Sequence, residues 1–187
     1  VKDGMKKRLP WLILLLFLGM IVSTVVGLFE SVVAEIAIVV CFQSLILDMA
    51  GNVGTQSLAV TIRLLVDENI SAKDKFKFTL KELNIGLSNG TILGLLSFVF
   101  IGFYIMLAKN RPFMDAFILS GCVGVSLFVA MVFSSLVGVV IPMFFHKIKV
   151  DPAVASGPLI TTINDLVAVV TYYGLAWILL IQVFHVH

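Results

Sequence analysis

The sequence predicts an all-α membrane protein with five transmembrane helices, and three observations lead to this fold class. Hydrophobic residues make up 60% of the 187 residues and only 13% are charged, whereas about a quarter of the residues of a soluble domain are charged. The apolar residues form unbroken runs, and about 20 such residues are enough to cross a bilayer. Eleven of the thirteen Lys and Arg residues lie in segments that five consecutive spans place on one side of the membrane.

The apolar runs define the expected spans, which cover residues 11–29, 36–66, 85–108, 116–145 and 152–184. The basic start of the chain resembles that of a signal peptide, but no Ala-x-Ala-like cleavage site closes the first run, so a retained helix is expected. The second and fifth runs exceed spanning length and are expected to tilt, kink or project beyond the lipid. The charged stretch 67–81 is expected to form a short helix or to extend a span.

The distribution of cations predicts the orientation of the chain. Basic residues cluster before the first span, between the second and third spans, and between the fourth and fifth, whereas Lys109 and Arg111 alone lie on the other side. The positive-inside rule therefore places the N-terminus in the cytoplasm. Five spans then place the C-terminus outside, and the expected location is the inner (plasma) membrane.

Several function classes are excluded by what the sequence carries. The net charge is +2 and the cations sit in short loops, so no nucleic-acid partner is expected. Cys41 and Cys122 form no CxxC pair and are interpreted as small packing residues. The histidines His146, His185 and His187 all lie at span ends, so no buried Ser or Cys has an evident base and an enzyme is not expected.

Two acidic residues lie inside the predicted spans, Asp48 in the second and Asp165 in the fifth. An ionisable group in hydrocarbon costs at least about 2.5 kcal/mol, so such a group faces a protein interior or a water-filled path and marks a functional site by default. A structural alternative is open for Asp48, which could pair with Arg63 or cap a broken helix.

Each of these acids belongs to a polar stripe that recurs at intervals of three and four residues, which places its members on one helical face. In the second span the stripe comprises Asp48, Asn52, Thr55, Gln56, Ala59 and Arg63, with Gly51 and Gly54 beside it. In the fifth span it comprises Gly157, Thr161, Asp165, Ala168 and Tyr172, with Asn164 beside it. The amides of Asn52 and Gln56 have an alternative role as hydrogen-bonding contacts between helices.

The ligands on these stripes are oxygen atoms, which favour hard cations such as Mg²⁺, Ca²⁺ or Mn²⁺. Mg²⁺ dehydrates reluctantly and is often held with its waters through one or two carboxylates. One Asp in each chain makes a weak site, whereas two copies around a twofold axis would form a carboxylate ring. This chemistry favours a homodimer with the pore at the subunit interface, and a path within each subunit is the alternative.

Three segments carry a resemblance to a known family. The segment Met49–Ser57 reads MAGNVGTQS and resembles the GNxGTQ-type segment of the MgtE family of magnesium channels. The segment Asp151–Asp165 is similar to the fifth transmembrane helix of that family, and Arg8–Trp11 resembles the start of its first helix. The resemblance covers nearly the whole chain, in the order of the family and with its five spans.

This resemblance implies a homodimer with a pore between the subunits, in which Asp165 is the main carboxylate for hydrated Mg²⁺. It places Thr161 and Gly157 one and two turns toward the cytoplasm on the pore face, although some family members carry Asn at the position of Gly157. Asn52 lies in a segment that borders the pore, which makes it a weaker candidate ligand. Asp48 completes the set of candidate metal-binding residues.

The whole chain, 1–187, is accordingly interpreted as a transmembrane pore domain whose partners are a second copy of itself and the lipid bilayer. Family members usually carry cytoplasmic Mg²⁺-sensing domains upstream, and this chain has no room for them. Its start at Val1 favours the transmembrane part of a longer protein. The leading hypothesis is a channel that conducts hydrated Mg²⁺ into the cytoplasm down its electrochemical gradient. The alternative is an H⁺- or Na⁺-coupled divalent-cation transporter, in which Asp48 would carry a proton.

Overall fold

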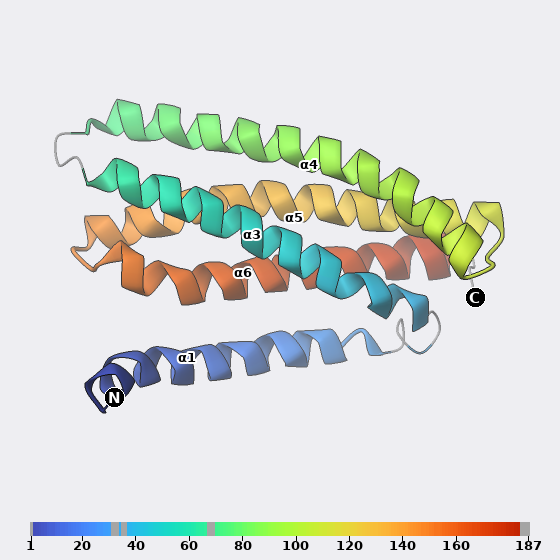
Figure 1. Cartoon of the computed structure of the whole chain (residues 1–187), viewed down its shortest axis with the longest axis horizontal. Coiled ribbons are helices and arrows are strands. Elements are labelled where there is room, and N and C mark those ends of the chain that lie inside the picture. The colour runs from blue at the N-terminus through green and yellow to red at the C-terminus, as the bar shows by residue number, and fades with distance from the viewer. Residues whose placement is uncertain (1, 31–33, 35–36, 67–69, 184–187) are drawn as a thin grey trace.

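The computed structural model describes residues 2–30, 34, 37–66 and 70–183, and Figure 1 shows that the described chain is a bundle of long helices. Five of these helices are long and apolar enough to cross a membrane. The all-α fold class is therefore confirmed, and each of the five predicted spans corresponds to one of these helices. Residue 36 of the second predicted span, residue 184 of the fifth and residues 67–69 of the charged stretch lie outside the described residues.

The long helices alternate in direction along the chain (Figure 1). They are α1 (Lys2–Gly27), α3 (Val40–Leu65), α4 (Ala72–Ala108), α5 (Phe113–Lys147) and α6 (Pro152–Leu175). A short 3-10 turn, η1 (Ala37–Val39), leads into α3, and a π-helical segment, η2 (Ala176–Val183), continues α6. The start of α1, the α3–α4 connection and the α5–α6 connection all lie at one end of the bundle (Figure 1).

The third span begins much earlier than the hydrophobic run predicts, because its helix starts at Ala72 and not near Ile85. From Ala72 onward, the charged stretch therefore extends the third span and does not form a separate short helix. Ser71 caps this helix, since its hydroxyl accepts a hydrogen bond from the Asp74 backbone N–H at 3.2 Å and donates one to the Asp74 carboxylate at 2.6 Å. A helix of 37 residues is about 55 Å long, so α4 exceeds the hydrocarbon thickness of about 30 Å.

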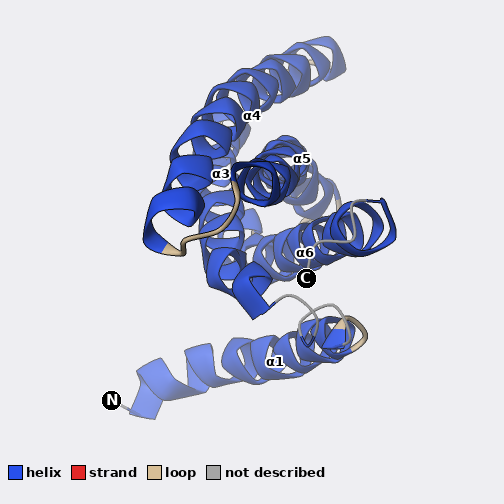
Figure 2. Cartoon of the chain, turned by 90° about the vertical axis from the view of Figure 1, so that its right-hand side faces the viewer, coloured by secondary structure: helices blue, strands red, loops and turns tan. Residues whose placement is uncertain are grey.

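The helices are arranged around α5, which packs against α3, α4 and α6. Helix α6 also contacts α3 and α1. Helix α1 lies along the margin of the bundle in both Figure 1 and Figure 2, and none of the residues in its most apolar window is buried. The two polar stripes thus belong to neighbouring helices, α3 and α6.

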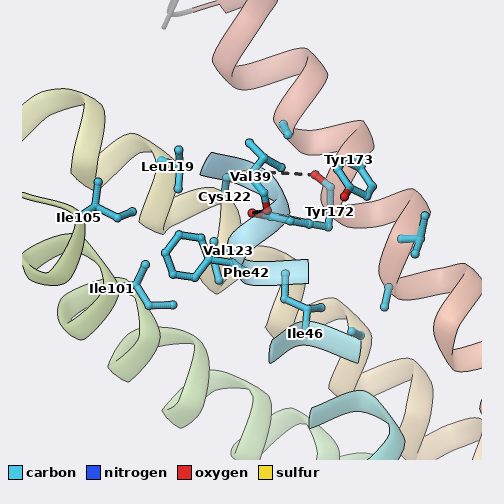
Figure 3. Packing of buried hydrophobic residues seen from close by; sticks show 14 of the residues in the cluster. Val39, Phe42, Ile46, Ile101, Ile105, Leu119, Cys122, Val123, Tyr172 and Tyr173 are labelled. Carbon is cyan, nitrogen blue, oxygen red and sulfur yellow. Dashed lines mark hydrogen bonds between the residues drawn. The ribbon is translucent and has the colours of Figure 1, made fainter. Parts of the chain in front are cut away.

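The interior has an apolar part near the η1 end of α3 (Figure 3). Side chains from four helices meet there, and the largest of them are Phe42, Ile46, Ile105, Val123, Tyr172 and Tyr173. The Tyr172 hydroxyl donates a hydrogen bond of 2.8 Å to the Val39 carbonyl, so the one polar atom of that ring is satisfied. Cys122 is buried in this cluster, as its interpretation as a packing residue requires, whereas Cys41 is exposed and the packing interpretation is wrong for it.

Toward the other end of the bundle the interior becomes polar, with Ser57, Glu82, Ser134, Ser135, Ser156 and Asn164 buried. Helices α3 and α5 cross closely in this region. A Cβ added at Gly138 would lie 2.6 Å from the Gly54 carbonyl oxygen and 2.8 Å from the Ser57 Cβ. Glycine is therefore required at this crossing, because small residues let two helix backbones approach.

Candidate cation-binding face

The polar stripe on α3 points away from the core of its own chain. Every member is exposed, namely Asp48, Asn52, Thr55, Gln56, Ala59 and Arg63. The opposite side of the same helix is buried, at Ile46, Ala50, Val53, Gly54, Ser57 and Thr61. The prediction that the stripe occupies one helical face is confirmed, and this face is open on the outside of the protomer.

Neither structural alternative for Asp48 fits this geometry. Asp48 and Arg63 are fifteen residues apart on one continuous helix, so their backbones are separated by about 22 Å. No ion pair joins the two side chains within the described part of the chain. The helix is unbroken from Val40 to Leu65, so Asp48 does not cap a break in it.

The stripe on α6 is open over half of its predicted length. Thr161 is exposed, whereas Asp165 and Gly157 are half-buried. The Thr161 hydroxyl donates a hydrogen bond of 3.1 Å to the Gly157 carbonyl, and a Cβ added at Gly157 would meet no atom within 4 Å. Gly157 therefore leaves open space on this face and is not required for packing within the chain.

The remaining two members of the α6 stripe, Ala168 and Tyr172, are buried, unlike the other three. Ala168 and Tyr172 are each only 1% exposed. The end of η1 lies over this part of α6, because the Tyr172 hydroxyl donates a hydrogen bond to the Val39 carbonyl. The five residues keep one direction on the continuous helix, but the accessible part of the stripe comprises only Gly157, Thr161 and Asp165.

A contact between α3 and α6 fixes the positions of Asp48 and Asp165 relative to each other along the helix axes. The Asn164 amide nitrogen lies 3.5 Å from the Ala50 carbonyl oxygen, which also accepts a hydrogen bond from the Ser134 hydroxyl. Asp165 is the next residue on α6, and Asn52 and Asp48 each lie two residues from Ala50 on α3. Since each residue advances a helix by about 1.5 Å, all three lie within about 3 Å of this contact along their helix axes.

Two buried polar atoms next to this face have no hydrogen-bond partner among the described residues, the Ser156 hydroxyl and the Asn164 side-chain oxygen. Both belong to α6, and they directly precede Gly157 and Asp165 in the sequence. Buried polar atoms are nearly always satisfied, in many cases by ordered water.

Among the acids, only Asp48 and Asp165 were singled out from the sequence, and the buried carboxylate of Glu82 on α4 was missed. Glu82 is buried, and its carboxylate accepts a hydrogen bond of 3.0 Å from the Ser57 hydroxyl on α3. The Ser135 hydroxyl on α5 donates to the Glu82 backbone carbonyl at 3.2 Å. The available signal was spacing, because Glu82 stands one turn before a row of buried glycines, Gly86, Gly90 and Gly94.

The described residues of one chain contain no group of three or more His, Cys, Asp or Glu side chains that could hold a metal ion. The open face instead supplies the carboxylates of Asp165 and Asp48, the Thr161 hydroxyl and the Asn52 amide. Such scattered oxygen ligands suit a hard cation that keeps part of its water shell.

Comparison with known proteins decides the family. The sequence model of the MgtE family, described as a divalent cation transporter, matches residues 43–175, which include both polar stripes. The chain belongs to the MgtE family. The resemblance seen in the two sequence motifs is thereby confirmed.

Three relatives in this family are each named magnesium transporter MgtE. The protein of Enterococcus faecalis is 41% identical over 170 residues and that of Bacillus subtilis 36% identical over 170 residues, in both cases covering 91% of this chain. The MgtE of Thermus thermophilus is 33% identical over 175 residues. The chain spans 36% of the length of each relative. The family is described by transport of divalent cations and not by catalysis.

Proposed function

We propose that this chain forms the pore of a Mg²⁺ channel in the plasma membrane, and that two copies form it together at their interface. The observation that carries this proposal is the open polar face shared by α3 and α6, which combines the exposed stripe from Asp48 to Arg63 with the exposed Thr161 and the half-buried Asp165. The names of the three relatives, all magnesium transporters, supply the cation.

The energetics of the bilayer support a water-filled path along this face. Asp48, Asn52, Thr55 and Gln56 are exposed on α3 with no protein covering them. A single Asp in hydrocarbon costs at least about 2.5 kcal/mol, and each exposed amide adds to this cost. Contact with water removes the penalty, and a second copy placed against the face would enclose that water.

A twofold axis beside this face brings the two Asp165 carboxylates together across the path. In this arrangement they bind Mg²⁺ through its water shell, and Thr161 and Asn52 offer a hydroxyl and an amide to the same waters. Gly157 keeps the cytoplasmic end of the path wide, because it adds no side chain there. Asp48 raises the local cation concentration from α3.

The membrane potential suffices to drive inward movement, because a divalent ion gains about 4.6 kcal/mol for each 100 mV, from about 2.3 for each charge. The orientation that this requires has the N-terminus in the cytoplasm and the C-terminus outside. Coupled transport with H⁺ or Na⁺ is the second candidate function. It is favoured by Asp48, which is exposed on the same face and has no basic partner among the described residues.

Flux into liposomes tests the proposal. The purified chain is reconstituted with a Mg²⁺-sensitive dye inside the vesicles, and a K⁺ diffusion potential is imposed without any Na⁺ or pH gradient. Uptake that follows the potential supports a channel. A requirement for an H⁺ or Na⁺ gradient, abolished by Asp48→Asn, would show coupled transport instead.

Asp165→Asn tests the role of the carboxylate with little change in shape. A unit charge 4 Å from a divalent cation contributes about 2 kcal/mol even at the dielectric constant of water, which corresponds to roughly thirtyfold in affinity. We therefore expect uptake to fall at least about tenfold. Asp115→Asn is the matched control, because Asp115 lies in the first turn of α5, away from this face. Equal uptake by the Asp165→Asn variant and the wild type would contradict the assignment.

A further inference from the structure

Helix α4 carries a second polar surface that the cation path does not use. It comprises Lys77, Lys81, Asn84, Ser88 and Asn89, which are all exposed and line a hollow of about 530 Å³ together with Leu80 and Ile85. Within the described residues, none of these five polar side chains forms a hydrogen bond or an ion pair. We call this surface the α4 polar hollow.

The position of α4 excludes the cation path as the reason for this surface. Figures 1 and 2 both place α4 at the edge of the bundle opposite α1. The buried face of α4, with Glu82 and its row of glycines, is turned toward α5 and α3. The α4 polar hollow therefore faces outward, where a membrane protein meets lipid.

The types of side chain along this face of α4 follow the same order as the parts of a phospholipid that they could bind. The two lysines stand one helical turn apart near the start of α4, which the positive-inside rule places at the cytoplasmic surface. Asn84, Ser88 and Asn89 follow within about 12 Å further along the axis. Beyond them the same face is apolar, with Ile92 57% exposed and Leu95 62% exposed. Cations thus come first, hydrogen-bonding groups second and hydrocarbon third.

A second hollow continues the first at the depth where acyl chains lie. It is a groove of about 460 Å³ between α4 and α5. Glycines from both helices and large apolar side chains line it, namely Gly90, Gly94, Gly121 and Gly124 and Leu95, Phe98, Val125 and Phe128. It adjoins the α4 polar hollow through Thr91 and Leu95, which follow Ser88 by three and seven residues and so lie on the same side of α4. Gly90, Gly94 and Gly124 let the two helices pack closely, since a Cβ added at any of them would come within about 3.1 Å of the facing backbone, and the groove is the channel that the large side chains leave beside this crossing.

We propose that these two hollows form one binding site for an anionic phospholipid of the cytoplasmic leaflet. Its phosphate lies between Lys77 and Lys81, its glycerol and ester oxygens accept hydrogen bonds from the amide and hydroxyl groups of Asn84, Ser88 and Asn89, and one acyl chain enters the α4–α5 groove. The lysines select for negative charge, since each basic side chain near the surface strengthens binding of anionic lipid. A protein partner would match the lysines but would not need the continuous apolar groove below them.

Native mass spectrometry of the chain in detergent tests this site by titration with phosphatidylglycerol and with phosphatidylcholine. We expect phosphatidylglycerol to bind preferentially, and the double variant Lys77→Ala/Lys81→Ala to weaken its binding by about tenfold or more, since each lysine contributes about 1 kcal/mol. The double variant Lys147→Ala/Lys149→Ala is the matched control, because it removes the same charge at the α5–α6 connection. It is expected to bind as the wild type does.

A variant of the groove separates the two parts of the site. Val125 is 49% exposed at the groove wall, so Val125→Trp fills the groove from the surface and is expected to weaken both lipids. Three results would overturn the proposal: equal effects of the two lysine pairs, competition by soluble glycerol phosphate as strong as by the lipid, or efficient cross-linking of Ser88→Cys between two copies in a bilayer. The last result would show that protein, and not lipid, covers this face.

Discussion

The close crossing of α3 and α5 makes a quantitative prediction for Gly138→Ala. The added Cβ would lie 2.6 Å from the Gly54 carbonyl oxygen and 3.3 Å from the Leu58 backbone nitrogen. Both atoms belong to the backbone of α3, so no side chain can turn aside to make room. Reaching ordinary contact at 3.4 Å from the carbonyl oxygen requires the two helices to separate by about 0.8 Å.

The cost follows from two opposing effects. Overpacking in a well-packed interior costs about 1–3 kcal/mol, whereas replacing Gly by Ala inside a helix contributes about 1 kcal/mol in favour of folding. A separation of this size also forfeits a quarter or more of the dispersion energy of atoms across the gap. We therefore expect the free energy of unfolding to fall by about 1–2 kcal/mol, which for a chain of this length lowers Tm by roughly 2–8 °C.

Thermal unfolding in detergent, followed by circular dichroism, measures this difference. Gly174→Ala is the matched control, because Gly174 also lies inside a membrane helix but a Cβ there would meet no atom within 4 Å. The control is expected to melt at or slightly above the wild-type temperature. If Gly138→Ala proves as stable as Gly174→Ala, the two helices do not approach as closely as the structure shows, and the argument from the crossing fails.

Two further variants probe the polar interior and the open face. Glu82→Ala removes the acceptor for the Ser57 hydroxyl and is expected to lower the free energy of unfolding by about 1.5–3 kcal/mol. Glu82→Gln keeps an acceptor oxygen and should lower it by less than half as much. Equal melting temperatures of the Ala variant and the wild type would exclude a stabilising role for the carboxylate. A Cβ added at Gly51 would meet no atom within 4 Å in its own chain. The Gly51→Ala variant should therefore melt no lower than the wild type and yet reduce Mg²⁺ flux into liposomes. Unchanged flux would show that the space beside Asn52 is not used by an ion or a second copy.

The fold class could be predicted from the sequence because lipid imposes length and composition on each span. The boundaries were harder, and α4 shows why. Hydrophobicity locates the part of a helix that lies in lipid, which begins near Ile85, but it carries no information on how far the helix continues into water. The signal for the true start was the cap at Ser71, followed by Asp74 in the first turn.

This difference in boundary had a chemical consequence. With the helix extended to Ala72, Glu82 becomes an interior residue of α4 and points at Ser57. A span that starts at Ile85 leaves the same residue in a solvated connection, where an acid needs no explanation. Burial of a carboxylate thus depended on a helix start that the hydrophobic pattern does not encode.

The stripes on α3 and α6 show a second limit, since periodicity gives the direction of a face but not what lies against it. Thr161 and Tyr172 have nearly the same direction on α6, yet the first is exposed and the second is sealed beneath Val39. Only the path of another segment, η1 with the start of α3, distinguishes them. The same reasoning applies to the outer face of α3, where polar residues from Asp48 to Arg63 have no cover from their own chain. Hydrocarbon cannot solvate such a face cheaply, and this cost is the physical reason for proposing a water-filled path between two copies.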